Sequence, residues 1–403
     1  MGRLYVDLFL IMSERAPHIL MVGGGTGGHV YPAIAIADAV RALRPDAQIV
    51  FAGTQDRLEA RAVPEAGYAL HPVTAQGIQR RAAASNLLLP LRVAQGLLQS
   101  WHLVGAINPD VAVGTGGYVS GPVLLAAWLR GRPLLIQEQN AYAGLTNRVL
   151  SRLASRVHLA FPEATDWVPA ERAVVSGNPT RRSLRKTDPD GTDGSPDGSR
   201  DRARVQARRD ARSALDLPED ARVVLVMGGS LGSATINGAV EHNLEALLSR
   251  QPSGDVHVVW QTGERYYDTI AEKIDELPRV HLVEYIDRME RAYAAADLVV
   301  CRAGALTCSE LMVTGTPAVL VPSPNVTADH QTKNARSLEQ AGAAVLLPEP
   351  ELKARLDEMV GDLLEDPDAL TRMAEAARER ARPDAAETIA RDVLTLADRY
   401  RSN

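Results

Sequence analysis

Short apolar runs alternate with longer amphipathic segments along the first part of the chain. The series starts at His18 with HILMVG, PAIAIADAVRAL and QIVFAG, and continues with DVAVGTGG, PLLIQEQ and RVHLAF. β-Branched runs that alternate with helical patterns are typical of βαβ units, which place parallel strands in one sheet. The pattern predicts an α/β domain over residues 18–182.

A second series of the same kind fills the later part of the chain. It consists of RVVLVMGG, VHVVWQTG, VHLVEYI, DLVVCRAG and PAVLVPS, separated by helical segments such as ATINGAVEHNLEALL. This series predicts a second parallel α/β domain over residues 215–380. The charged amphipathic pattern of residues 381–403 predicts a C-terminal helix that packs back on the first domain.

Two segments lack these patterns. Residues 183–214 are rich in Asp, Gly, Ser and Arg without apolar periodicity, so we expect a disordered linker that buries no apolar surface. Residues 1–17 precede the first predicted strand, and their apolar part is interrupted by Asp7. Because no small-residue cleavage site follows, we expect an N-terminal extension and no secretory signal.

Composition narrows the class of protein. A chain of 403 residues with 45% hydrophobic content is too long for one ordinary core, which supports two domains. The formal charge of −6 argues against nucleic acid as a partner, because phosphates are normally met by a basic surface. Two cysteines, Cys301 and Cys308, are too few for a disulfide framework or metal cluster, and we expect buried, reduced thiols. No apolar run reaches the ~20 residues that span a bilayer.

A glycine-rich loop follows the first predicted strand. Residues 21–32, MVGGGTGGHVYP, predict a strand, a tight turn and a helix with Pro32 in its first turn. Such glycines let a ligand approach the backbone and leave helix N-terminal amides free for an anion. The loop also matches the GxGxxG spacing of dinucleotide-binding proteins, with Asp56 as a late candidate for the ribose acid. A purely structural turn is the third interpretation.

Two further glycine loops follow strands, GTGGYVSG at 114–121 and GGSLGS at 228–233. A nicotinamide cofactor needs one phosphate loop, whereas a nucleotide-sugar donor facing a second phosphorylated substrate needs anion sites on both sides of a cleft. Ligands of open α/β sheets bind at the carboxyl ends of the strands, where all these loops lie. The repetition therefore favours a two-substrate cleft.

The ordered motifs of the chain resemble those of the MurG family of glycosyltransferases, from His18 to the final helices. They are GGTGGHVYPA, GTGGYVSGP, QEQNAYAGLTNR, SGNPTR, GGSLGSATIN, YIDRMERAYAAADLVVCRAGALTCSE and HQTKNA. The resemblance implies an α/β fold of GT-B type, with two Rossmann-like parallel-sheet domains facing a cleft. The first domain would bind mainly the acceptor and the second mainly the UDP-sugar.

The resemblance also implies an activity and a location. N-acetylglucosamine would move from UDP-N-acetylglucosamine to the 4-hydroxyl of the muramyl sugar of undecaprenyl-pyrophosphoryl-MurNAc-pentapeptide, with inversion and without a cofactor. The product would be the lipid-linked disaccharide precursor of peptidoglycan, which connects the enzyme to cell-wall biogenesis, cell shape and cell division. The protein would be peripheral, at the cytoplasmic face of the inner membrane, near other cell-wall synthesis proteins.

The resemblance carries donor contacts onto particular residues. Ser230 would meet the phosphates, Ile286 the uracil and Glu310 the ribose hydroxyls, while Gln331, beside His330, would bind the sugar hydroxyls. The remaining implied contacts are Thr26, Gly27, Gly28, Asn140, Arg181, Ala305, Leu306, Thr307, Cys308 and Ser309. Taken alone, Asn140 could cap a helix, Glu310 could form a surface ion pair and Arg181 could be a solvated linker residue.

Some positions depart from the family pattern. Gln137 stands where histidine is usual, which puts a catalytic role there in doubt. Leu231 and Ser233 replace the usual Gln and Ala, and Ala303 replaces a frequent Ser. We expect the loop backbone to survive and some side-chain bonds to the phosphates to be lost.

His29 is the first candidate for the general base that deprotonates the acceptor hydroxyl. Histidine titrates near working pH, and the positive end of a helix dipole disfavours its protonation. The alternative is that His29 binds phosphate or fixes the loop. Glu138 and Tyr118 are the other candidates. We expect no metal, because no paired acids lie beside the glycine loops to hold a cation against the diphosphate.

Residues 79–101 combine basic and apolar side chains, which fits attachment to an anionic membrane surface. The apolar residues are Leu87, Leu88, Leu89 and Leu91, beside Arg80, Arg81 and Arg92, and the resemblance adds Trp128. The alternative is a core helix with a solvated charged end.

Other functions stay open at this stage. A UDP-N-acetylglucosamine 2-epimerase on the same architecture would bind the same donor. A nicotinamide dehydrogenase and a non-catalytic nucleotide-sugar sensor are the alternatives from other classes.

Overall fold

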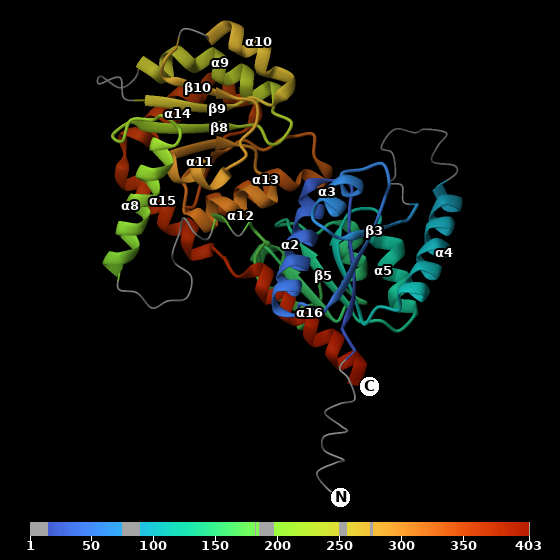
Figure 1. Ribbon diagram of the computed structural model, residues 1–403. Coiled ribbons are helices and arrows are strands. Elements are labelled where there is room, and N and C mark those ends of the chain that lie inside the picture. Colours follow the sequence, from blue (N-terminus) through green and yellow to red (C-terminus); the bar gives the residue numbers. More distant parts are fainter. Residues whose placement is uncertain are drawn as a thin grey trace, which may run out of the picture.

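The computed structural model describes residues 15–74, 89–181, 183–184, 197–249, 256–274 and 277–402. These residues form two α/β domains, each with one parallel sheet covered by helices on both faces (Figure 1). The predicted extension 1–17 lies almost entirely outside the described residues, and so does much of the predicted linker.

The first domain holds a seven-stranded sheet in the order β3-β2-β1-β4-β5-β6-β7. Its strands are β1 (His18–Gly23), β2 (Gln48–Gly53), β3 (Ala69–Pro72), β4 (Val111–Gly116), β5 (Leu134–Glu138), β6 (Arg156–Leu159) and β7 (Ala173–Val175). Its helices are α2 (Gly27–Leu43), α3 (Glu59–Glu65), α4 (Leu89–Ile107), α5 (Ser120–Leu129) and α6 (Leu145–Leu150). The central strands are apolar on both faces, as a sheet covered on both sides requires.

The second domain repeats the topology with the order β10-β9-β8-β11-β12-β13. Its strands are β8 (Arg222–Met227), β9 (Val256–Gln261), β10 (Val280–Val283), β11 (Leu298–Cys301), β12 (Ala318–Leu320) and β13 (Val345–Leu346). Its helices are α8 (Asp197–Ser213), α9 (Ala234–Ser249), α10 (Glu264–Ile274), α11 (Met289–Ala295), α12 (Ala305–Thr314), α13 (His330–Gln340), α14 (Leu352–Glu365) and α15 (Pro367–Arg380). This doubly wound order confirms the predicted Rossmann-like pair of GT-B type.

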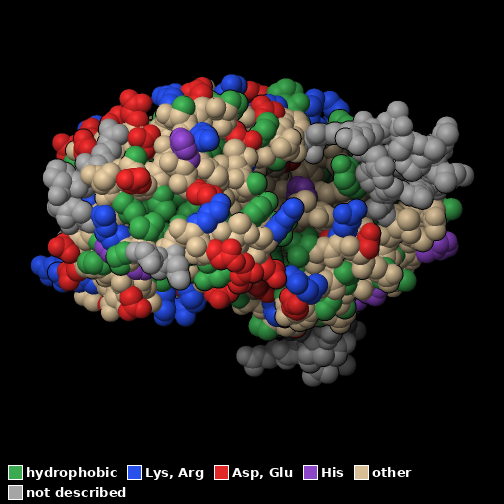
Figure 2. Space-filling model, turned by 90° about the horizontal axis from the view of Figure 1, so that it is seen from above, with side chains coloured by type: hydrophobic (Ala, Val, Ile, Leu, Met, Phe, Trp, Pro, Cys, Tyr) green, Lys and Arg blue, Asp and Glu red, His purple; other side chains and the backbone are tan. Residues whose placement is uncertain are grey.

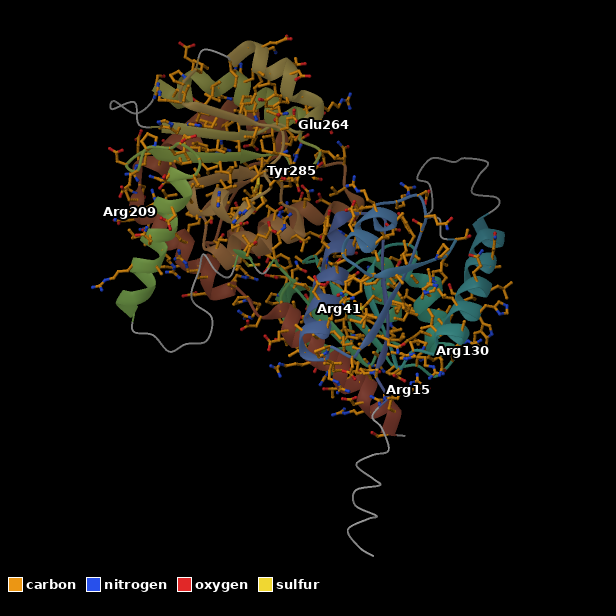
Figure 3. The ribbon with its side chains drawn as sticks, viewed as in Figure 1. Arg15, Arg41, Arg130, Arg209, Glu264 and Tyr285 are labelled. Carbon is orange, nitrogen blue, oxygen red and sulfur yellow. The ribbon has the colours of Figure 1, made fainter. Side chains whose placement is uncertain are left out.

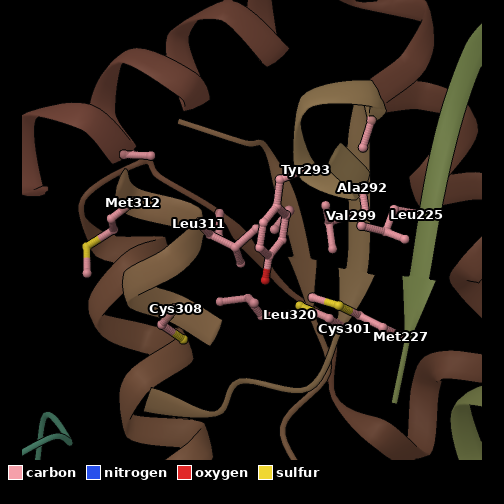
Figure 4. Close-up of a cluster of buried hydrophobic side chains, with 14 of the residues drawn as sticks. Leu225, Met227, Ala292, Tyr293, Val299, Cys301, Cys308, Leu311, Met312 and Leu320 are labelled. Carbon is pink, nitrogen blue, oxygen red and sulfur yellow. The ribbon is translucent and has the colours of Figure 1, made fainter. Parts of the chain in front are cut away.

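The core under one face of the second sheet surrounds Tyr293 (Figure 4). Cys301 and Cys308 lie in this core as free thiols. Burial raises the pKa of Cys308 to about 12, so its thiol stays protonated near neutral pH. Both cysteines therefore act as apolar packing groups.

The last helix, α16 (Ala385–Ser402), returns to the first domain. It packs along α2, and its buried residues Ile389, Ala390, Val393 and Ala397 join the core of the first sheet. The crossing from α15 to α16 ties the second domain to the first.

The expectation of disorder over residues 183–214 is wrong for its second half. Residues 197–213 form α8, which packs on α11. Ala211 is buried, and Arg212, 1% exposed, donates to Asp297 at 2.8 Å and to the Ala295 carbonyl at 3.2 Å. This helix docks through a buried ion pair and a small residue, so it shows no apolar stripe in the sequence.

Candidate active site

Segments that follow the carboxyl ends of strands in both sheets meet between the two domains, and the surface there is hollowed (Figure 2). In the first domain, β1 ends at Gly23 and α2 begins at Gly27. A Cβ at Gly23 would lie 2.2 Å from Thr115 Oγ1, so only glycine lets β1 and β4 approach this closely. The first and second glycine loops therefore lie side by side at one edge of the sheet.

Glu59, which the sequence analysis did not single out, supports the first glycine loop through hydrogen bonds. Its side chain is fully buried and accepts hydrogen bonds from the Gly25 amide at 2.9 Å and the Thr54 hydroxyl at 2.7 Å. A carboxylate against the Gly25 amide repels a phosphate there, whereas the amides at the start of α2 remain for an anion. Asp56, the candidate ribose acid, is instead exposed and lies near Arg57. Both findings disfavour the dinucleotide interpretation.

His29 lies half-buried in the first turn of α2, and its ring contacts Thr115 at the end of β4 and Gln139 just after β5. Its Nδ1 is 3.0 Å from the Thr115 carbonyl oxygen and 2.8 Å from Gln139 Oε1. Both partners are acceptors, so Nδ1 carries the proton and the neutral ring has its lone pair on Nε2. In the described part of the chain no side chain binds Nε2, which leaves a base available at the cleft.

The first residues of the second glycine motif end β4 at Gly116, and the loop that follows carries Tyr118, which is 61% exposed. Gly117 has φ +87°, and a Cβ there would lie 2.3 Å from the Gly24 carbonyl oxygen. The Gly24 amide donates to the Gly116 carbonyl at 3.4 Å. The loop is thus fixed against the first one, and Tyr118 projects from it into solvent.

Both carboxylate oxygens of Glu138 accept hydrogen bonds from the loop and helix that follow β5. Oε1 accepts from the backbone and side-chain nitrogens of Asn140 at 3.0 and 3.1 Å, and Oε2 accepts from the Gly144 amide at 3.0 Å and Asn147 Nδ2 at 2.8 Å. These bonds occupy both oxygens and stabilise the loop after β5. The geometry therefore argues against Glu138 as the general base.

Asn178 and Asn334, which the sequence analysis did not single out, join the two domains together with Asn140. Asn178 Nδ2, after β7, donates to Ser309 Oγ at 2.9 Å and to the Ala305 carbonyl at 3.3 Å, both on α12. Asn334 on α13 accepts from the Ala141 amide at 2.9 Å and donates to Asn140 Oδ1 at 3.3 Å. Asn140 therefore bridges the domains, and the helix-cap alternative is wrong.

Glu310 and Arg181 come together from the two domains. Glu310 is 12% exposed, lies 3.8 Å from the Arg181 guanidinium and accepts from the Tyr293 hydroxyl at 3.0 Å. Burial raises the pKa of Glu310, while Arg181 and Tyr293 oppose that shift. The surface-ion-pair alternative does not fit so enclosed a carboxylate. Arg181, with 48% of its side chain exposed, is no isolated linker residue.

The third glycine loop places Ser230 at the surface, with Leu231 83% exposed beside it. Arg302, which the sequence analysis did not single out, donates to Ser233 Oγ at 2.8 Å and also pairs with Glu349. Ser233 thus supports an arginine next to the loop, a role that the usual Ala could not fill.

The turn at the start of α12 offers fewer amides than its sequence suggests. Gly304 precedes the helix and provides no side-chain cap, so the amides of Ala305, Leu306 and Thr307 are unsatisfied by the helix. The Cys308 amide already donates to the Gly304 carbonyl at 2.9 Å. Cys308 and Ser309 are buried, so they are poor candidates for direct donor contact through their amides.

The other residues predicted to contact the donor differ in their burial and hydrogen bonding. Ile286 is half-buried against the second core, Gln331 Oε1 accepts from the Ser323 amide at 2.8 Å, and Thr26 and Gly28 are exposed on the first loop. Burial lowers the pKa of His330, near His29 and Glu138. Among the residues that the structure describes, no three His, Cys, Asp or Glu side chains are grouped to hold a metal.

The predicted membrane residues lie only partly within the described chain. Leu87 and Leu88 are outside it, and Leu89 and Leu91 belong to α4, whose side chains are described from residue 94 onward. Trp128 is 42% exposed at the end of α5. Within the described residues, no helix combines the length and apolar character needed to cross a membrane.

Comparison with known proteins covers both domains. The glycosyltransferase family 28 N-terminal domain matches residues 19–159, and the family 28 C-terminal domain matches residues 223–389. A curated relative from Salinibacter ruber, named UDP-N-acetylglucosamine--N-acetylmuramyl-(pentapeptide) pyrophosphoryl-undecaprenol N-acetylglucosamine transferase, is 76% identical over 97% of this chain and 100% of its own length.

Solved structures agree in fold. The crystal structure of Acinetobacter baumannii MurG matches with a TM-score of 0.73 at 28% identity, covering 94% of this chain and 99% of that one. A UDP-GlcNAc 2-epimerase from Neisseria meningitidis matches with a TM-score of 0.62 at 13% identity, over 94% and 100% of the two chains, which indicates a shared fold alone. The chain therefore belongs to glycosyltransferase family 28 and, within it, to the MurG family.

Proposed function

We propose that this protein transfers N-acetylglucosamine from UDP-N-acetylglucosamine to the 4-hydroxyl of the muramyl sugar in undecaprenyl-pyrophosphoryl-MurNAc-pentapeptide. The observation that carries the proposal is the 76% identity, over nearly the whole chain, to the Salinibacter ruber relative that bears this activity in its name. The product would be the lipid-linked disaccharide precursor of peptidoglycan, and the activity would thereby serve cell-wall growth, cell shape and division.

The proposed reaction is a single displacement with inversion at the anomeric carbon. His29 Nε2 takes the proton of the acceptor hydroxyl while the oxygen attacks, and the bond to UDP breaks with its electron pair leaving on the diphosphate. The free Nε2 at the start of α2 supports this role. The amides at the start of α12 and the Arg181 guanidinium would meet the leaving diphosphate.

The direct test supplies radiolabelled UDP-N-acetylglucosamine and a lipid-linked muramyl-pentapeptide in the presence of EDTA, because we propose catalysis without a metal. Label should move to the lipid only when the acceptor is present. Conversion of the donor to its 2-epimer without acceptor would instead identify an epimerase. Loss of transfer in EDTA with recovery in magnesium would refute the metal-free cleft.

Glu310 is proposed to bind the ribose hydroxyls of the donor. Replacing it in Glu310→Ala should raise the donor KM about tenfold or more, because a charge-assisted hydrogen bond contributes about 1.5–3 kcal/mol. Initial rates against donor concentration measure this constant. Glu310→Gln, which keeps an acceptor for Tyr293, should retain the fold and still raise KM, while Glu358→Ala on the exposed face of α14 should not. An unchanged KM in both Glu310 variants would leave this residue only its contacts with Arg181 and Tyr293.

We also propose peripheral attachment to the cytoplasmic face of the inner membrane, where other cell-wall synthesis proteins would be neighbours. The observation that supports this is a set of exposed or partly exposed side chains on the packed helices α4 and α5 or directly after them, which we call the α4–α5 face: Leu98, Trp101, Trp128, Leu129 and Arg130. Their apolar members are exposed by 62%, 38%, 42% and 52%, and the Arg130 guanidinium lies 4.1 Å from the centre of the Trp101 ring. Arg130 lies on the side of the first domain away from the second (Figure 3). Aromatic and basic side chains together suit an anionic interface.

Binding to vesicles of anionic phospholipid tests the α4–α5 face. The double substitution Leu98→Asp with Leu129→Asp should lower the vesicle partition coefficient about tenfold or more, because each buried leucine contributes about 1.5–3 kcal/mol. The control Val205→Asp changes an equally exposed side chain on α8 of the other domain. Co-sedimentation that is indifferent to the double substitution and to salt would refute this surface.

A further inference from the structure

A chain of side-chain amides runs from His29 through the buried interior to the second domain. His29 Nδ1 lies 2.8 Å from Gln139 Oε1, and Gln139 Nε2 donates in turn to Gln137 Oε1. Gln137 Nε2 donates to Asn178 Oδ1 at 2.9 Å, and Asn178 Nδ2 donates to Ser309 Oγ on α12 at 2.9 Å. Gln139, Gln137 and Asn178 are each at most 2% exposed.

Backbone carbonyls fix the orientation of the three side-chain amides in this series, because a carbonyl oxygen can only accept a hydrogen bond. Gln139 Nε2 donates to the carbonyls of Thr115 at 2.7 Å and Gln137 at 3.0 Å. Gln137 Nε2 donates to the Glu138 carbonyl at 3.2 Å, and Asn178 Nδ2 to the Gln139 carbonyl at 3.0 Å. The bonds between side chains therefore follow one direction, from His29 through Gln139, Gln137 and Asn178 to Ser309 on α12.

The direction of these hydrogen bonds determines the tautomer of the His29 imidazole. Since Gln139 must present Oε1 to His29, the ring must present Nδ1–H to Gln139, and the neutral ring keeps its lone pair on Nε2. Hydrogen bonds that run in one direction through a buried site also polarise one another. Reversing the donors and acceptors of the series would therefore cost free energy. Gln137, at the position where the family usually has histidine, supplies both the acceptor and the donor that such a chain needs at this point.

We infer that Gln139 is a positioning residue, which acts with the Thr115 carbonyl to fix the His29 ring with Nδ1 protonated and Nε2 free. It touches no reacting atom and acts through His29, and the amides of Gln137 and Asn178 hold it in place. The inference deepens the proposed function, since it rests on His29 as the base of the proposed transfer.

The tautomer of His29 tests the inference without any substrate. In long-range ¹H–¹⁵N spectra of deuterated protein, with His29→Gln used for assignment, the wild type should show neutral His29 as the Nδ1–H form. Gln139→Met removes the side-chain acceptor at similar volume and should give a measurable Nε2–H population. The same substitution at Gln48, exposed at the opposite edge of the sheet, is the matched control. An unchanged tautomer in Gln139→Met would overturn the inference.

Activity profiles against pH provide the second measurement, and Gln139→Glu provides the second variant. A carboxylate beside Nδ1–H favours the imidazolium, so the acid limb of kcat/KM should move to higher pH by about 1 unit or more. Gln139→Met should lower kcat about tenfold with the donor KM nearly unchanged, as expected for loss of one orientation. A limb that does not move in Gln139→Glu, or a Gln139→Met variant whose only change is a higher donor KM, would overturn the positioning role.

The two measurements separate this inference from the proposed function. If wild-type protein transfers no sugar but the His29 tautomer depends on Gln139, the positioning role stands and the proposed function fails. If transfer proceeds and the tautomer ignores Gln139, the proposed function stands and the inference fails.

Discussion

His29→Ala is expected to lower kcat by about 10²-fold or more, as the loss of a general base requires, while the donor KM changes little. The ring donates Nδ1–H to Thr115 and Gln139, and this leaves Nε2 as the free acceptor at the start of α2. A base that acts only on the acceptor hydroxyl contributes in the transition state and adds little to donor binding. Initial rates at saturating acceptor, with donor varied, separate kcat from KM.

The control for this prediction is His242→Ala, because His242 is exposed on α9 of the second domain. Both constants should stay at their wild-type values in that variant. A His29→Ala variant with weakened donor binding but full turnover at saturation would assign His29 to phosphate contact. Tyr118, exposed on the neighbouring loop, would then be the remaining candidate for the base.

The parts of the fold and site that the sequence predicted are those that local patterns determine. Strands such as VVLVM in β8 are apolar on both faces, so a continuous apolar run between helical segments is enough to indicate a covered parallel sheet. The glycine loops are equally local, because positive φ values at Gly25, Gly117 and Gly229 require that residue type. The position of His29 beside the first glycine loop follows from the sequence in the same way, because His29 comes directly after that loop, while its role stays a prediction.

The residues that the sequence analysis missed act over long separations. Glu59 supports the glycine loop from 34 positions away, and Asn178 reaches Ser309 across 131 positions. Both are common polar residue types. Asn178 stands in the SGNPTR motif, but nothing local gives either residue its distant partner. Their roles emerge only when the sheets bring them to the same edge.

The prediction of disorder over the α8 residues was wrong for a different physical reason. Apolar periodicity in a sequence predicts helices that pack through an apolar stripe. Helix α8 packs on the second domain through charged groups instead. Asp297, 8% exposed, accepts from Arg212 at 2.8 Å and from the Val223 amide at 2.7 Å, and pairs with Arg208 at 2.5 Å. A run of arginines and aspartates looked solvated because its partner carboxylate lies at the start of β11, far along the chain.

Asp297→Ala should therefore destabilise the second domain by about 3–5 kcal/mol, the usual effect of removing one partner of a buried ion pair. The variant leaves the Arg212 guanidinium, 1% exposed, without its carboxylate and the Val223 amide without its side-chain acceptor. Urea unfolding followed by circular dichroism measures the loss, which is a large share of the ~5–15 kcal/mol that stabilises a typical domain.

Two further variants show whether the buried pair is the cause of that loss. Glu241→Ala breaks the exposed pair with Lys273 and should change the free energy of unfolding by less than about 1 kcal/mol. Adding Arg212→Met to Asp297→Ala should recover part of the loss, because the uncompensated buried charge is then gone. If Asp297→Ala costs no more than the Glu241 control, α8 is held to the second domain by its apolar contacts, and the buried ion pair contributes nothing to its docking.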